Sequence, residues 1–192
     1  MAKIFLLGIL GDTGTFNYIK PNQLKTFDNV KKLVKISQVE IQDFKAGYDT
    51  ITKRIFETIG EYIKNTKYTN RQDKLSFQYS FLSREFITKN KLTNTETSSA
   101  SHIYMANYLR AIENYTWGFV VTPKNDGCGI SLRSLPGSVS CLDISERAGI
   151  GGGHDRVSGG AINWPSSSSK KDYHYALKQM LDWIKNNELK YV

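Results

Sequence analysis

The spacing of apolar residues changes once along the chain, from a helical period to a strand period. Within residues 22–65 the apolar positions lie three or four residues apart, which places them on one face of a helix. They form two runs: Leu24, Phe27, Val30, Leu33 and Val34, and then Ile51, Ile55, Ile59 and Ile63. Because Gly47 separates the two runs, we expect two helices with a break between them.

From about residue 66 onward, the pattern is typical of strands joined by turns and helices. Residues 74–81 alternate apolar and polar side chains, which predicts a half-buried strand. Two β-prone segments, 115–122 and 128–133, flank the turn sequence Pro-Lys-Asn-Asp-Gly and therefore predict a hairpin. Helices are expected over 99–113, 140–147 and 169–188, a loop over the glycines 151–153, and a short strand over 161–164. The prediction is an α/β chain with a mixed sheet flanked by helices.

Composition divides the chain into three regions: residues 1–21, a helical connector over 22–65, and a larger domain over 66–192. Residues 4–10 are apolar throughout, with no capping residue before them, which is typical of a segment from the interior of a larger fold. We therefore expect this segment to be poorly ordered or covered by another chain.

Overall composition narrows the class of protein. The 192 residues are 40% hydrophobic and 23% charged, which is a globular composition and excludes disorder over the whole chain. The longest apolar run is far shorter than the ~20 residues that cross a bilayer, so neither a membrane span nor a signal peptide is expected. The formal charge of +8 favours anionic partners such as nucleotides or RNA, although a solvated basic surface has the same charge.

Cysteine and histidine usage argues against several enzyme classes. The two cysteines, Cys128 and Cys141, are too few for a disulfide framework, which favours a cytoplasmic location. Neither has a histidine nearby in sequence, and no Gly-x-Ser-x-Gly or P-loop motif occurs. His102 and His174 lie in predicted helices, where we expect surface or packing roles.

A first candidate site follows the apolar N-terminal run. Residues 8–16 read Gly-Ile-Leu-Gly-Asp-Thr-Gly-Thr-Phe, so Asp12 places its carboxylate at the end of an apolar segment. Divalent metals are bound by such oxygen ligands. A helix end with a capping aspartate explains the same residues, and one carboxylate does not make a metal site.

A second candidate site combines glycines with cationic residues. Gly151, Gly152 and Gly153 precede His154. Consecutive glycines let the backbone come close to an anion and surround it with N–H groups, to which the imidazole adds a donor. Arg133, at the end of a predicted strand, offers a guanidinium fork for phosphate oxygens. A flexible glycine loop and a solvated strand end are the alternative interpretation.

Taken in order, these motifs resemble the C-terminal portion of DHH-family phosphoesterases. Residues 8–18 resemble the last motif of the catalytic DHH domain. The sequence Ser-Leu-Arg-Ser at 131–134, followed by a short helix and Gly-Gly-Gly-His at 151–154, resembles the DHHA1 substrate-binding domain. The chain is most similar to the branch of nano-RNases, phosphoadenosine-phosphate phosphatases and exopolyphosphatase-related proteins.

The resemblance implies where metal and substrate would bind. Family members hold two manganese ions (Mn2+) through Asp and His side chains, and a metal-activated water attacks the phosphorus. Of those ligands this sequence matches Asp12, and the family's Asp-x-Asp and Asp-His-His motifs are absent. The residues that match the family's substrate-binding positions are Arg133, Ser134, Gly151, Gly152, Gly153 and His154.

We therefore expect the substrate-binding portion of a manganese-dependent phosphoesterase that hydrolyses short oligonucleotides or nucleotide phosphates. Because the metal-binding motifs are missing, the chain is expected to be inactive alone. Its expected partners are short RNA or nucleotide phosphates, a separate catalytic half and, as in the family, a second copy in a homodimer. Two alternatives stay open: a stand-alone RNA-binding DHHA1 module without catalysis, and a protein-interaction domain whose 4–10 segment docks on a partner.

Overall fold

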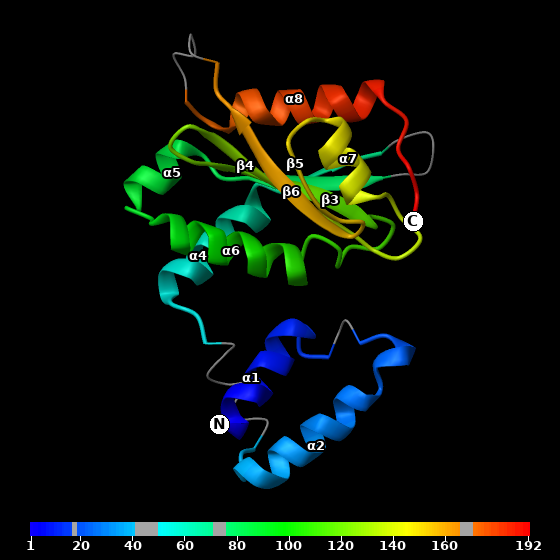
Figure 1. Ribbon diagram of the computed structural model, residues 1–192. Helices are drawn as coiled ribbons and strands as arrows, with labels where there is room; N and C mark the ends of the chain where they lie inside the picture. The colour runs from blue at the N-terminus through cyan, green and yellow to red at the C-terminus, as the bar shows by residue number, and fades with distance from the viewer. Residues whose placement is uncertain (17–18, 41–49, 71–75, 166–170) are drawn as a thin grey trace. The chain divides into compact units, whose positions relative to one another are not determined.

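The computed structural model describes residues 1–16, 19–40, 50–70, 76–165 and 171–192 (Figure 1). They form two compact units, Met1–Ile51 and Thr52–Val192. The contacts therefore divide the chain after Ile51. The division into residues 1–21, 22–65 and 66–192 that was expected from composition stays a prediction. The expected break at Gly47 lies outside the described residues.

The first unit consists of two helices and a short turn: α1 (Ala2–Asp12), the 3-10 turn η1 (Pro21–Gln23) and α2 (Lys25–Ser37). α2 confirms the first helix predicted from the apolar spacing. Leu6 and Leu10 of α1 are buried against Val30 of α2, so one face of the apolar segment packs within the chain. Its other face stays exposed through Ile4, Phe5 and Leu7. No helix in the described ranges is long and apolar enough to span a bilayer.

The second unit is built on a six-stranded mixed sheet, which confirms the predicted α/β fold. In spatial order the strands are β1 (Lys67–Thr69), β2 (Phe77–Phe81), β3 (Trp117–Pro123), β4 (Gly127–Ser134), β6 (Val157–Asn163) and β5 (Gly151–His154). The β2–β3 pair is parallel, and every other neighbouring pair is antiparallel. β3 and β4 form the predicted hairpin, in which Thr122 pairs with Gly129.

Helices cover both faces of this sheet. They are α4 (Lys53–Lys64), α5 (Arg84–Lys89), α6 (Asn94–Asn107), α7 (Cys141–Arg147) and α8 (Tyr173–Asn186). In Figure 1, α8 lies across one face, and α4 and α6 lie across the other. The main hydrophobic core is on the α7 and α8 side, where Trp117, Phe119 and Met180 are buried. α4, α7 and α8 confirm the helices predicted in these parts of the sequence.

The opposite face of the sheet is joined to its helices by hydrogen bonds. The Tyr62 hydroxyl of α4 lies 2.6 Å from Thr122 Oγ1, and Ser80 donates to the Tyr62 carbonyl over 2.6 Å. Gln78 Nε2 donates to the Leu109 carbonyl. Gln78 and Ser80 are consequently buried, so the prediction of a half-buried strand was wrong. The polar positions of β2 are covered because α4 and α6 occupy the face that the alternation assigned to solvent.

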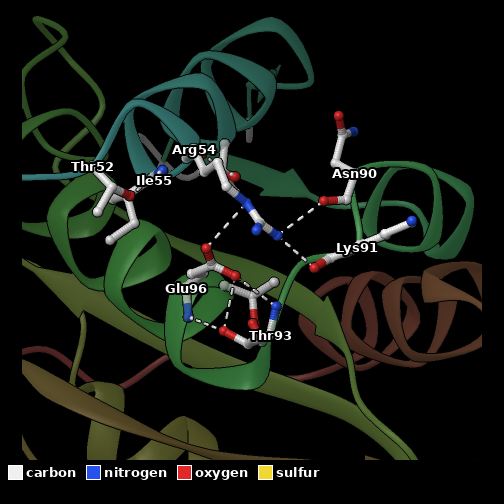
Figure 2. A network of polar contacts seen from close by, with 9 residues as sticks. Thr52, Arg54, Ile55, Asn90, Lys91, Thr93 and Glu96 are labelled. Carbon is white, nitrogen blue, oxygen red and sulfur yellow. Dashed lines mark hydrogen bonds and ion pairs between the residues drawn. The ribbon is translucent and has the colours of Figure 1, made fainter.

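α6 begins at Asn94 and ends at Asn107, so it starts and stops five or six residues before the prediction. A capping box determines its start: Glu96 N donates to Thr93 Oγ1 over 3.2 Å, and Thr93 N donates to the Glu96 carboxylate over 2.8 Å. Figure 2 shows Arg54 of α4 reaching the same carboxylate. The first turn of α6 is polar throughout and therefore has no apolar period from which to predict it.

The glycines 151–153 form strand β5, so the prediction of a loop was wrong. Glycine is required at positions 151 and 153 because a side chain there would meet the backbone of β6. A Cβ on Gly151 would lie 2.3 Å from the Gly159 carbonyl oxygen, and one on Gly153 would lie 2.6 Å from the Val157 carbonyl oxygen. β6 accordingly begins at Val157, before the short strand predicted from residue 161.

Candidate functional site

An open groove lies on the sheet face that α4 and α6 cover in part. These helices contact β2 and β3, whereas the part of the face formed by β4, β6 and β5 stays accessible. The result is a cavity of about 470 Å³ between α6 and the open strands. Its polar and cationic lining includes Ser98, Ser101, His102, Lys124, Ser131 and Arg133. We call this cavity the groove.

The floor of the groove is nearly bare because glycines recur where three strands lie side by side. Gly152 of β5 pairs with Gly159 of β6, which pairs with Ser131 of β4. Paired residues of neighbouring strands share a face, so this row adds a single hydroxymethyl group to the floor. A phosphate or a flat ring can therefore come close to the backbone.

Arg133 lies two residues beyond Ser131 on β4 and hence on the same face of the sheet. Its side chain is half-buried and lines the groove. One of its donors, Nη1, bonds the carbonyl of Leu132 over 2.8 Å, which restrains the guanidinium. The five N–H groups of a guanidinium match the oxygens of a phosphate, so a restrained Arg133 is suited to hold an anion here.

His102 of α6 shares the groove with Arg133. Its side chain has an exposed edge, yet surrounding protein atoms and, second, the Arg133 guanidinium hold the pKa of the imidazole below its usual value. His102 is therefore neutral near pH 7 and offers one N–H donor and one acceptor. An anion placed between the two residues would offset the Arg133 charge and favour protonation of His102.

Lys124 marks the other end of the groove. It follows β3, and its side chain lies across Gly129 of β4: a Cβ on Gly129 would lie 2.7 Å from Lys124 Cε and 3.1 Å from Nζ. The ammonium group can take this position because Gly129 has no side chain. The groove therefore has a cation at each end, Lys124 at the β3–β4 turn and Arg133 near the end of β4.

His154 lies beside the groove rather than in its lining. It pairs with Val157, which pairs with Arg133, so the three residues share a row and a face of the sheet. Two strand spacings, roughly 10 Å, separate the backbones of His154 and Arg133. Its side chain is exposed at the sheet edge. Of the three predicted glycines Gly152 lines the groove, and Gly151 and Gly153 alternate to the other face.

The turn that follows His154 is fastened to the start of α7. Cys141 N donates to the Asp155 carbonyl over 2.6 Å, and Ser140 Oγ donates to the Asp155 carboxylate over 3.0 Å. Ser140 is also the N-cap of α7, where its hydroxyl accepts from Asp143 N over 3.1 Å. These bonds hold the end of the β5–β6 hairpin, which positions His154 relative to the groove.

Ser134 lies on the opposite face of β4 from Arg133. It is fully buried, and its hydroxyl donates to the Asp155 carbonyl over 3.5 Å. Arg110 donates to the Ser134 carbonyl over 3.3 Å. The structure thus brings Arg133 and Gly152 together in the groove, whereas Ser134 is buried on the other face of the sheet. The expected role of Ser134 in substrate binding stays a prediction.

Asp12 belongs to the first unit, where it ends α1 and is exposed. It lines a cavity of about 170 Å³ whose other polar side chains include Thr13, Gln23 and Asn29. Nowhere in the described part of the chain do three or more His, Cys, Asp or Glu side chains gather as metal ligands. Asp12 is the one carboxylate among the described residues that line this cavity, so the donors around it do not fit a two-metal site.

Sequence reasoning did not place His102 or Lys124 in the site. It assigned His102 to a surface or packing role and Lys124 to a turn. The alternation along β4 could have identified Ser131, because a residue two positions before Arg133 on a strand shares its face. No comparable signal connects His102 or Lys124 to β4, since these two residues reach the groove from other elements.

Fold and groove together define an α/β protein with a cationic groove on an open sheet face. An exopolyphosphatase-related protein from Bacteroides fragilis has a similar solved structure, with a TM-score of 0.66 and 18% identity, over 92% of this chain and 47% of that chain. An uncharacterized protein from Helicobacter pylori G27 matches with a TM-score of 0.35 and 14% identity, over 93% of this chain and 45% of that chain. This chain thus spans about half the length of each. No model of a known family and no curated protein sequence matches it.

Proposed function

We propose that this chain is the substrate-binding portion of a phosphoesterase, and that its groove binds the phosphate of a short oligonucleotide or nucleotide phosphate. The observation that carries the proposal is the position of Arg133 and His102 in one groove beside a glycine floor. The guanidinium supplies charge and a donor fork, the imidazole supplies a neutral donor, and the floor leaves room for the ligand.

The charges around the groove favour an anion. Arg133 and Lys124 are cationic, and none of the described residues that line the groove is Asp or Glu. A cavity lined by one sign of charge concentrates ligands of the opposite sign, and the chain's formal charge of +8 acts in the same direction. The name of the Bacteroides fragilis neighbour, exopolyphosphatase-related, supports phosphate as the recognised group.

The chain by itself is proposed to bind without hydrolysing. Asp12 contributes at most one ligand to the two manganese ions that the family resemblance implies, so the remaining ligands would come from residues outside this chain. Incubation of the full chain with manganese and a diribonucleotide should therefore release no mononucleotide. Turnover at an enzyme-like rate would contradict the expectation that the chain alone is inactive. It would not contradict the proposed phosphate site in the groove, which the binding experiment tests separately.

Calorimetry with a phosphorylated diribonucleotide tests the groove itself. Arg133→Ala should lower the affinity at least about tenfold, because a charged hydrogen-bonding fork is removed. His154→Ala should have a smaller effect, since His154 lies beside the groove. Lys178→Ala on α8 removes the same charge from an exposed position and should leave the affinity unchanged. Equal affinities of wild type and Arg133→Ala would contradict the proposed site.

A stand-alone RNA-binding module is the second candidate, favoured by the formal charge and by a groove that is open along the strands. Such a module needs no terminal phosphate and loses affinity steeply with salt. Removing the terminal phosphate from the diribonucleotide separates the two functions. Unchanged affinity would favour the module, whereas a large loss supports the phosphoesterase portion.

The cysteines suit the cytoplasmic location that we propose. Cys128 and Cys141 are both free and buried. Burial, the main cause, raises the pKa of the Cys141 thiol to about 11, so this thiol stays protonated and unreactive at neutral pH. Neither cysteine is therefore proposed to act in the chemistry of the groove.

A further inference from the structure

A second cavity, of about 230 Å³, continues the groove beyond Lys124 at the β3–β4 turn. Its lining includes three amide side chains and one carboxylate, from Asn94, Asn125, Asn163 and Asp126. We call it the asparagine pocket. We infer that the asparagine pocket binds a nucleobase, so that groove and pocket together select single-stranded oligonucleotides over mononucleotides. This inference rests on the proposed function, because it assigns the substrate class of the same site.

The two cavities lie end to end along the same elements. On β4, Gly129, Ser131 and Arg133 line the groove, whereas Gly127 and Cys128 line the pocket. The residues of β6 follow the same order, because Gly159 lines the groove and Asn163, further along the strand, lines the pocket. Lys124 lines both cavities, so a ligand that leaves the groove at this end enters the pocket beside the ammonium group.

The spacing of the two cations sets the length of a fitting ligand. Lys124 crosses Gly129, and Arg133 lies four residues further along β4, a separation on the order of 13 Å at the backbone. This spacing suits a ligand that carries more than one phosphate. A chain with one phosphate at Arg133 and another at Lys124 contacts both, and its next base then lies at the asparagine pocket.

The chemistry of the pocket suits a base rather than more phosphate. Apart from Lys124, none of the described residues that line it is Lys or Arg, and Asp126 would repel an anion. Amides pair with the donor and acceptor edge of adenine, and a carboxylate accepts from an exocyclic amino group.

Hydrogen bonds preform the turn that supports the pocket. Lys124 N donates to the Gly127 carbonyl over 2.8 Å, and Trp164 N donates to the Asp126 carbonyl over 3.2 Å. Arg84 donates to the Lys124 carbonyl from α5. These bonds use backbone atoms at residues 124, 126 and 127. A preformed pocket costs a ligand less ordering, which increases the affinity that a few polar contacts can supply.

Calorimetry with AMP, diadenylate and triadenylate, each in 5′- and 3′-phosphorylated form, tests the inference on the full chain. Triadenylate should bind the wild-type chain at least about tenfold more tightly than AMP. Asn163→Ala and Asn94→Ala, both at exposed positions, should remove most of this gain and leave AMP binding unchanged. Lys124→Ala should also remove the gain, whereas Lys178→Ala should not. Tripolyphosphate should bind equally well to the wild type and to Asn163→Ala.

The outcomes separate the inference from the proposed function. If triadenylate and AMP bind equally, or if neither asparagine variant changes the gain, the asparagine pocket does not bind a base and the phosphate site of Arg133 still stands. If Asn163→Ala weakens tripolyphosphate as much as triadenylate, the pocket binds phosphate, and the inference is overturned. If no phosphorylated probe binds the wild-type chain, both proposals fail.

Discussion

Arg54 of α4 and Glu96 of α6 form an ion pair, with Arg54 Nε 3.1 Å from Glu96 Oε1 (Figure 2). The same carboxylate caps the first turn of α6 by accepting from Thr93, and Arg54 Nη2 donates to the carbonyls of Asn90 and Lys91. Arg54 thus connects α4 both to the loop before α6 and to the first turn of α6. Because α6 forms one wall of the groove, this network helps to place the wall.

Glu96→Gln should destabilise the chain at neutral pH and much less in acid. Hydrogen bonds from the Thr93 backbone and side chain, and then the Arg54 charge, lower the pKa of Glu96. A carboxylate with a lowered pKa stabilises the fold above its ordinary pKa and loses that contribution as the pH falls through the folded-state value. Urea unfolding of wild type and variant at neutral and acidic pH measures the difference.

The control for this prediction is Glu57→Gln, because Glu57 pairs with Lys53 at an exposed position on α4. Its substitution should change stability little at either pH. A Glu96→Gln effect that is equally large in acid would show that the carboxylate charge does not contribute to the cap.

Phosphate binding should be coupled to protonation of His102. Burial and the Arg133 charge lower the pKa of His102, and a bound anion would raise it. Protons are therefore taken up on binding, and affinity should increase as the pH falls from neutral toward the pKa of the free imidazole. NMR titration of the imidazole with and without ligand measures the shift directly.

His102→Gln keeps a neutral donor and should remove the added pH dependence. A phosphodiester ligand without a terminal phosphate makes this comparison cleaner, because a terminal phosphate itself titrates near pH 6. An imidazole pKa that does not move when ligand binds would place the anion away from His102.

Tyr62→Phe should destabilise the second unit by about 1–2 kcal/mol, because it leaves the buried Thr122 hydroxyl without its partner at 2.6 Å. Burial raises the pKa of Tyr62, so its phenol keeps the proton for this bond at any ordinary pH. Tyr68→Phe, at a half-exposed tyrosine, is the control and should stay within about 0.5 kcal/mol of wild type. Equal effects in urea unfolding would contradict the role of the Tyr62–Thr122 bond.

Gly151→Ala and Gly152→Ala should differ although the residues are neighbours. A Cβ at Gly151 would lie 2.3 Å from the Gly159 carbonyl, so alanine there should cost about 1–3 kcal/mol. A Cβ at Gly152 meets nothing within 4 Å, and alanine there should leave stability nearly unchanged. Because Gly152 lines the groove, its substitution should instead weaken binding of the phosphorylated diribonucleotide. Similar stabilities for the two variants in thermal unfolding would contradict the close pairing of β5 and β6.

The start of α6 and the β3–β4 hairpin show which structural features the local sequence pattern can predict and which it cannot. The hairpin could be predicted because its strands are β-prone and its turn residues are adjacent in sequence. α6 was predicted too late, although Thr93 and Glu96 carry the spacing of a capping box, because the apolar period starts only after the polar first turn. The glycines of β5 carry no strand signal, since their strand is defined by the approach of β6.

By itself the sequence determined the α/β composition of the fold, the hairpin and the place of Arg133 near the end of a strand. These features depend on residues that are close together in the chain. Only the tertiary structure decided that Arg133, His102 and Lys124 line one groove and that Ser134 faces the other layer. The physical reason is that strand order, register and the position of α6 depend on contacts between segments far apart in the sequence, which no local pattern encodes.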